Sequence, residues 1–286
     1  MKQSGLDPRR HAYRDDLAAK GLEGRVEAPR FAEGRLYQVR VVRTPVRRQP
    51  RLDAPRDTEA LMGEHLTVYD EIEGWAWGQL ERDGYVGYLP LADLSLDIMT
   101  PTHRVAGILA LVYASPSALS EPIQHLSFNA HVTVIGERGA FAELATGGFI
   151  GKKYLTEAGT IDPDYVAAAR RFTGLPYLFG GKSAFGLDCS GLVQNVMQAA
   201  GYNVPRDSDM QAAEIGPKIE IGENLNGLQV GDIVFWPGHV GLMVDRTTLV
   251  HASATNMSVA LEEVREAAER SRGDGPIVQA VARPER

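Results

Sequence analysis

The stretch GGKSAFGLDCSGLVQNVMQAAG, residues 180–201, decides how the last part of this 286-residue chain folds. Its second half repeats apolar residues at helical spacing: Leu192, Val193, Val196, Met197 and Ala200. Gly201 is a typical helix end, so the pattern predicts a glycine-rich loop and then a helix that begins near Cys189. Because the positive end of a helix favours a thiolate, we expect the pKa of Cys189 to be lowered.

Three strands are predicted downstream, over residues 232–236, 240–244 and 249–252. A three-residue loop from Asp245 to Thr247 would place His251 opposite Gly241, with His239 as its diagonal neighbour on the same face. A two-residue loop would put the histidines on opposite faces. In the first register His239 can take the thiol proton while His251 fixes its tautomer, as in acyl-transfer enzymes.

Other interpretations of these residues stay open. A lone cysteine in a helix is often a buried filler, and a single histidine is often structural. Zinc binding by Cys189, His239 and His251 is a further alternative, although no close-spaced pair such as CxxC or HxxxH supports it. The glycine-rich approach to Cys189 favours catalysis, with no metal and no cofactor expected.

The residues before this region predict small β units and an internal repeat. His65 to Val68 is echoed by His131 to Val134, and Tyr85 to Tyr88 by Phe149 to Lys152, at an offset of about 65 residues. With a helix expected over residues 7–20 and another over 162–174, the predicted organisation is a helical segment (1–30), two β modules (31–98 and 99–157) and an α+β domain (158–286).

Composition excludes several partners. Thirty Lys and Arg residues against 37 Asp and Glu give a net charge of −7, which argues against nucleic acid. The longest apolar run, Val105 to Ala114, is about half of the ~20 residues that a membrane helix needs, so no membrane is expected. The N-terminus shows no apolar leader stretch, and one cysteine allows no intramolecular disulfide. We therefore expect a cytoplasmic protein.

Three motifs in order make the last domain similar to the NlpC/P60 cysteine peptidases. They are GLDCSGLV (186–193), GDIVF with GHVG (231–241) and VHA (250–252), and the resemblance covers about residues 160–284. The upstream repeats resemble bacterial SH3 domains, and the whole arrangement resembles γ-D-glutamyl-L-diamino acid endopeptidases of murein recycling. The resemblance implies two small all-β SH3-like barrels followed by an α+β papain-like domain.

The resemblance also implies roles for particular residues. Cys189, His239 and His251 would form the catalytic triad. Asp188 and Ser190 would hold the D-glutamate of the substrate, and Asp207 would help to bind the free amine of its L-alanine, since a charge-assisted contact to an ammonium rejects acylated ends. In the first SH3 domain the best matches for the same amine pocket are Glu64 and Tyr85, with Tyr88 as a competitor.

Two positions depart from the pattern of the resembled subfamily. Phe179 stands in the substrate wall where tryptophan is common. Lys152 replaces the hydrophobic end of the barrel motif in the second repeat, which suggests a spacer without a ligand groove.

The implied function is hydrolysis of the bond between γ-D-Glu and a diamino acid in murein tri- and tetrapeptides with a free N-terminal L-Ala. The rivals are a secreted hydrolase of intact wall with SH3 wall-binding modules, a non-enzymatic wall-peptide receptor, and a lipid acyltransferase of the same superfamily. The sequence leaves the preferred diamino acid and the oligomeric state unknown.

Overall fold

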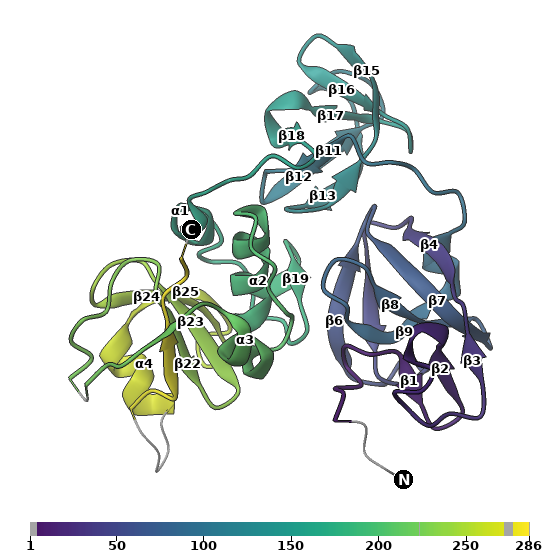
Figure 1. Cartoon of the computed structure of the whole chain (residues 1–286). Coiled ribbons are helices and arrows are strands. Elements are labelled where there is room, and N and C mark those ends of the chain that lie inside the picture. The colour runs from purple at the N-terminus through teal and green to yellow at the C-terminus, as the bar shows by residue number, and fades with distance from the viewer. Residues whose placement is uncertain (1–4, 223, 272–276, 286) are drawn as a thin grey trace. The chain divides into compact units, whose positions relative to one another are not determined.

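The chain divides into two compact units, residues 1–159 and 160–286 (Figure 1). The structure, a computed structural model, describes residues 5–222, 224–271 and 277–285. Residues 1–3, which are part of the stretch where no leader was expected, lie outside the described residues. Within the described residues every α-helix lies in the second unit, and none is long and apolar enough to cross a membrane.

The N-terminal segment corrects the first expectation, because residues 7–20 do not form a helix. It contains β1 (Tyr13–Arg14), β2 (Leu17–Ala19), η1 (Lys20–Leu22) and β3 (Phe31–Ala32). The Asp7 carboxylate accepts the backbone N–H of Arg9 at 2.8 Å and closes a turn at residues 7–10. All three residues of β2 are buried, which suits a strand packed against Trp77 and not a surface helix with one apolar face.

The first β module is one antiparallel sheet with strand order β10-β4-β7-β8-β9-β5-β6. Its elements are β4 (Arg35–Val39), β5 (Arg43–Arg47), β6 (Arg56–Leu61), β7 (His65–Ile72), β8 (Trp75–Leu80), β9 (Val86–Pro90), η2 (Leu91–Asp93) and β10 (Leu94–Ser95). Alternate side chains, such as Leu66 and Val68 of β7, are buried in a core to which every strand of the sheet contributes.

The second β module repeats this strand order. Its elements are β11 (His103–Val105), β12 (Leu109–Tyr113), β13 (Pro122–Ser127), β14 (His131–Val132), β15 (Val134–Arg138), β16 (Phe141–Leu144), β17 (Phe149–Gly151), η3 (Lys152–Tyr154) and β18 (Leu155–Glu157). They pair as β14-β11-β18 and β13-β12-β17-β16-β15, so β14 and β15 together take the place of β7. The strand pairing therefore shows the internal repeat that the sequence predicted.

Strand pairing keeps the first motif match, Val68 with Val134, and corrects the second match by three residues. Gly87 corresponds to Gly148, because Arg47 pairs with Tyr88 in the first module and Tyr113 pairs with Phe149 in the second. A Cβ atom at Gly87 would lie 2.5 Å from Cγ1 of Val46, and one at Gly148 would lie 2.6 Å from Cγ1 of Val112. Close packing against a strand thus demands glycine at both positions.

This register removes the argument from Lys152. Tyr88 corresponds to Phe149, and Lys152 opens η3 as Leu91 opens η2. Both modules therefore have an aromatic residue at this position, Tyr88 in the first and Phe149 in the second.

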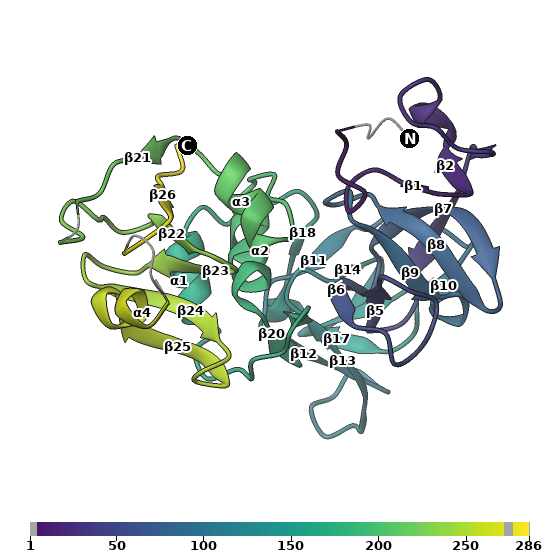
Figure 2. The same ribbon diagram turned by 90° about the horizontal axis from the view of Figure 1, so that it is seen from below.

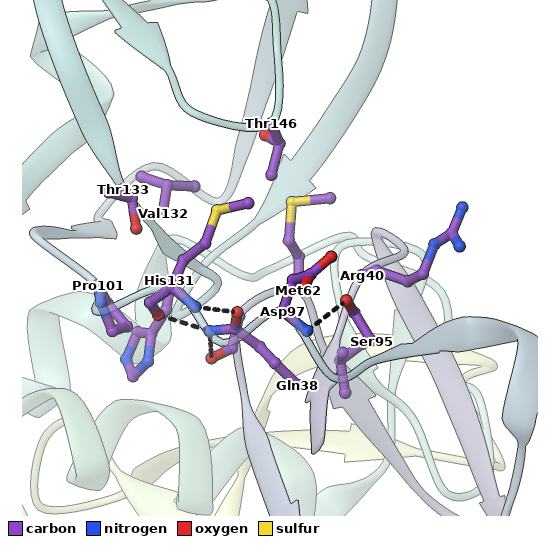
Figure 3. A pocket seen from close by; sticks show the side chains of 13 residues that line it. Gln38, Arg40, Met62, Ser95, Asp97, Pro101, His131, Val132, Thr133 and Thr146 are labelled. Carbon is purple, nitrogen blue, oxygen red and sulfur yellow. Dashed lines mark hydrogen bonds between the residues drawn. The ribbon is translucent and has the colours of Figure 1, made fainter. Parts of the chain in front are cut away.

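The two modules meet within the first unit. The His131 N–H donates to the carbonyl oxygen of Met62 at 2.9 Å, and a small pocket lies beside this junction (Figure 3). The Gln38 side-chain oxygen accepts the N–H of Met99 at 2.9 Å, and its amide nitrogen donates to the Met99 carbonyl oxygen at 2.9 Å. Backbone and side-chain hydrogen bonds therefore join the modules at this point.

The second unit is an α+β domain built on the sheet β21-β26-β22-β23-β24-β25 (Figure 2). Its strands are β19 (Lys182–Ser183), β20 (Gly186–Leu187), β21 (Lys218–Ile219), β22 (Ile233–Trp236), β23 (His239–Met243), β24 (Thr248–Ser253), β25 (Ser258–Glu263) and β26 (Ala280–Ala282). Its helices are α1 (Tyr165–Arg170), α2 (Cys189–Ala199), α3 (Ser208–Glu214) and α4 (Val264–Ser271).

Two helices matter for the site. Helix α2 is buried along almost its whole length and packs against α1, β23 and β24. Helix α4 directly follows β25 and buries Val264, Ala267 and Ala268 in a cluster with Met243 and Leu249 of the sheet. Helix α2, which carries Cys189, therefore contacts the central strands β23 and β24, and α4 contacts their neighbour β25.

Candidate active site

Cys189 is the first residue of α2, as the sequence predicted. Asp188 is the N-cap, and its carboxylate accepts the backbone N–H groups of Gly191 at 2.7 Å and Gly180 at 2.8 Å. A Cβ atom at Gly191 would lie 2.3 Å from the carbonyl oxygen of Gly181, so the loop can approach the first turn only because that residue is glycine. The loop and cap thus fix the position of the thiol.

His239 and His251 lie together in the predicted register. Met243 pairs with Leu249 and Leu242 with Val250, which continues to His251 opposite Gly241. Nε2 of His239 lies 2.8 Å from Nδ1 of His251. His251 is 1% exposed, so its ring orientation is set by the sheet and its two neighbours.

The histidine pair continues into two residues that the sequence analysis missed. Nε2 of His251 lies 2.9 Å from Oε2 of Glu262 on β25. Glu262 in turn accepts hydrogen bonds from both terminal guanidinium nitrogens of Arg270 on α4, one of them at 2.8 Å. A fourth strand was not predicted, because the turn before β25 has Met257 at φ 51° and carries no glycine. The alternation from Ser258 to Glu263 was the signal available.

The thiol lies beside the start of β23. The backbone N–H groups of Val240, the residue after His239, and of Ser190 act on the Cys189 thiol, and each lowers its pKa. These contacts bring Cys189 and the His239 strand together at one point of the second unit.

The electrostatics of the thiol correct the expected thiolate. Burial, and then the charge of Asp188, raise the pKa of Cys189 to about 12, and the residue is 8% exposed. Burial, followed by the neighbouring charges of His251 and Arg270, lowers the pKa of His239 to about 4. Desolvation outweighs the helix N-terminus, so the resting pair is a neutral thiol beside a neutral imidazole.

Asp188 and Ser190 are held by a buried arginine that the sequence analysis did not consider. Arg206 donates to the Asp188 carboxylate at 2.8 Å and to the Ser190 hydroxyl at 2.8 Å. It is 1% exposed. Their predicted role in binding D-glutamate stays a prediction, and Arg206 gives both residues a second, structural function.

Asp207 and Tyr177 lie near the same loop. Asp207 is half-buried and is the N-cap residue of α3, but within residues 205–222, all of which the structure describes, its carboxylate makes no capping hydrogen bond. Burial, and then the charge of Cys189, raise the pKa of Tyr177 to about 12. Phe179, the predicted wall residue, is 62% exposed.

Glu64 and Tyr85 belong to the first unit and are both buried there. Oε1 of Glu64 lies 3.1 Å from NH1 of Arg82. Tyr85 belongs to the core of the first module. Their predicted part in an amine pocket stays a prediction.

The structure also bears on the alternative of a zinc site at Cys189, His239 and His251. In the part of the chain that the structure describes, no three His, Cys, Asp or Glu side chains gather to hold a metal ion. The facing nitrogens of His239 and His251 are 2.8 Å apart, which leaves no room for an ion between them.

Comparison with known protein families matches one segment in each of the two units. Residues 174–274 match the NlpC/P60 family, and residues 46–94 match the bacterial dipeptidyl-peptidase SH3 domain. The chain is 26% identical over 232 residues to gamma-D-glutamyl-L-lysine dipeptidyl-peptidase of Bacillus subtilis, a match that covers 71% of this chain and 74% of the relative. It is 28% identical to dipeptidyl-peptidase 6 of Lysinibacillus sphaericus, over 76% of this chain and 88% of the relative.

A solved structure supports the fold. The crystal structure of an NlpC/P60 family protein from Bacillus cereus aligns with a TM-score of 0.71 and 20% identity, covering 87% of this chain and 99% of that one. Together with the matched domains and the Cys189 site, this shows that the chain carries an NlpC/P60 cysteine peptidase domain behind a bacterial SH3 domain.

Proposed function

We propose that this peptidase hydrolyses the bond between γ-D-Glu and a diamino acid, lysine or diaminopimelate, in short murein peptides that have a free N-terminal L-Ala. The observation that carries the proposal is the likeness over most of the chain to two enzymes named as dipeptidyl-peptidases, one of them specific by name for γ-D-glutamyl-L-lysine. An enzyme that releases a dipeptide must recognise a free amine two residues before the cleaved bond.

The site geometry supports acyl transfer through Cys189. His239 takes the thiol proton as the sulfur attacks the γ-carbonyl carbon, and it then gives that proton to the leaving amine of the diamino acid. A water molecule next loses a proton to His239 and attacks the thioester, which releases the dipeptide acid and restores the thiol. Because thiol and imidazole are both neutral at rest, proton transfer and attack occur together.

Two donors are proposed for the oxyanion of the tetrahedral intermediate. The first is the backbone N–H of Cys189 at the start of α2. The second is the phenol of Tyr177, and its electrostatic interaction with Cys189 supports this assignment.

Asp207 is the proposed partner of the substrate ammonium. It directly follows Arg206, which binds the residues on both sides of Cys189. Glu64 and Tyr85 are proposed to contribute more weakly. The Glu64 carboxylate already faces Arg82, so we expect Glu64→Gln to reduce amine recognition less than Asp207→Asn does.

We further propose that residues 99–157 form a second SH3 domain. The shared strand order and the matching glycines Gly87 and Gly148 support this proposal. We also propose that the enzyme works in the cytoplasm on recycled wall peptides, for which the single cysteine is the supporting observation.

The test is hydrolysis of L-Ala-γ-D-Glu-L-Lys, of the diaminopimelate analogue and of their N-acetylated forms, with product masses as the readout. Acetylation removes the positive charge and leaves carboxylates without a partner, so kcat/KM should fall on the order of 10³-fold. Asp207→Asn should lower kcat/KM for the free peptide much more than for the acetylated one. Asp209→Asn, two residues along and exposed on α3, is the matched control.

Cleavage of free and acetylated peptides within about threefold of each other would refute the amine pocket. Cleavage of intact sacculi at a comparable rate would favour a wall hydrolase over a recycling enzyme.

A further inference from the structure

Glu262, the residue that follows His239 and His251 in this row of hydrogen-bonded side chains, has no part in the mechanism described so far. Glu262 lies on β25 with its side chain 11% exposed, and it faces His251 on one side and Arg270 on the other. The neighbouring residue Glu263 points to the other face of the strand and is exposed. Only Glu262, two residues beyond the Ala260 that pairs with His251, can reach the imidazole.

The carboxylate determines where the protons of both histidines lie. Ionised Glu262 only accepts hydrogen bonds, so Nε2 of His251 must carry a hydrogen. Nδ1 of the same neutral ring is then a lone pair. Nε2 of His239 faces that lone pair at 2.8 Å and must carry a hydrogen itself. Nδ1 of His239 is therefore left as the basic nitrogen.

We infer that Glu262, held in place by Arg270, is a positioning residue that sets the tautomers of His251 and His239 so that Nδ1 of His239 is the base for Cys189. The inference deepens the proposed function and rests on it. It extends the Cys189–His239–His251 triad by a carboxylate that touches neither the thiol nor the substrate.

Arg270 keeps the carboxylate ionised and oriented. Its two terminal nitrogens hold both oxygens of Glu262, and this hydrogen bonding lowers the pKa of Glu262. Without the guanidinium, the carboxyl group could rotate and lose its alignment with His251.

Glu262→Gln is the sharpest variant, because it keeps the size of the side chain and removes the charge. The amide can turn its NH₂ group toward His251, which places a lone pair on Nε2 of His251 and moves the hydrogen of His239 onto Nδ1. We expect kcat for the peptide to fall about 10- to 100-fold with KM little changed. Glu262→Asp, which keeps the carboxylate, should recover part of the loss.

Two readouts separate positioning from a purely structural role. Nitrogen-15 NMR of the imidazoles should show lone-pair signals for Nδ1 of His239 and His251 in the wild type and the reversed tautomer in Glu262→Gln. Alkylation by iodoacetamide, followed as whole-protein mass because Cys189 is the only cysteine, should slow about 10-fold or more. A variant that fails to fold is replaced by Arg270→Lys, which tests the same carboxylate from its other side.

The controls are Glu263→Gln on the same strand and Arg265→Gln on the same helix. Arg265 donates to the carbonyl oxygen of Asn224 and not to Glu262. Both should alkylate at the wild-type rate. Wild-type tautomers and alkylation within twofold in Glu262→Gln would overturn the inference. A wild-type enzyme that fails to cleave the peptide, but shows these tautomers and their loss in Glu262→Gln, would refute the proposed substrate and leave the inference standing.

Discussion

Two buried clusters of this molecule contain histidine, glutamate and arginine in different orders. In the second unit His251 meets Glu262, and Arg270 stands behind the glutamate. In the first unit Arg82 donates directly to Nε2 of His131 at 2.6 Å, and Glu64 stands behind the arginine. Burial is the main reason for a lowered pKa of both His131 and His251.

The order decides what each histidine can do. Burial, and then a guanidinium at Nε2 that needs the ring lone pair and repels a second proton, lower the pKa of His131 to about 4 and hold the ring neutral. A carboxylate at Nε2 of His251 fixes a hydrogen there and stabilises the positive charge that develops on His239 during the reaction. The first arrangement ties two β modules together, and the second prepares a base.

The largest expected difference between the clusters is in activity. Cys189→Ala should abolish hydrolysis without unfolding the protein, and His239→Ala should be equally inactive, because one supplies the covalent step and the other every proton transfer. His131→Gln keeps an acceptor for Arg82 and should leave kcat/KM within about threefold. Steady-state kinetics on L-Ala-γ-D-Glu-L-Lys provides the comparison. A tenth of wild-type activity in Cys189→Ala would disprove the cysteine mechanism.

His251 should show an intermediate effect. It touches neither thiol nor substrate, so His251→Gln should lose roughly 10²-fold in kcat and keep measurable activity. Its amide can still accept from Nε2 of His239, which explains the remaining rate. Equal loss from His251→Gln and His239→Ala would instead indicate that both imidazoles transfer protons or bind a shared metal, and a stoichiometric zinc assay would then distinguish these two cases.

Local patterns were enough to predict the centre of the site. The helix at Cys189 and the three-residue loop that sets His239 beside His251 both follow from neighbours in sequence. Glu262 and Arg206 depend on side chains that meet across strands or loops, and sequence periodicity contains no signal for such contacts. The predicted lowering of the Cys189 pKa was wrong for the same reason, because the desolvation that raises it depends on the packed domain.

The first unit shows the same limit. Alternation predicted the β modules and the repeat, but the motif match aligned Gly87 with Gly151, whereas strand pairing makes Gly87 equivalent to Gly148. The helix expected over residues 7–20 failed because burial of Leu17 to Ala19 against Trp77 outweighs helix propensity.

The smallest expected effect concerns acid stability, where the clusters should behave alike. An unfolded histidine takes up a proton near pH 6.5, whereas His131 in the folded unit does so only near pH 4. Unfolded chains therefore bind more protons in this window, and the free energy of unfolding of the first unit should fall as the pH drops from about 6.5 to 4. The shift corresponds to at most about 3 kcal/mol, and above pH 6.5 this contribution is constant.

Urea unfolding at pH 7.5 and pH 5 would measure this fall in a Trp236→Phe background, where Trp75 and Trp77 report on the first unit alone. His131→Gln has no proton to bind, so the difference between the two pH values should shrink by about 1–3 kcal/mol. The parent protein, measured at the same two pH values, is the reference. An equal pH dependence in His131→Gln and the parent would mean that His131 is protonated in the folded state, which the guanidinium of Arg82 at 2.6 Å from its Nε2 should prevent.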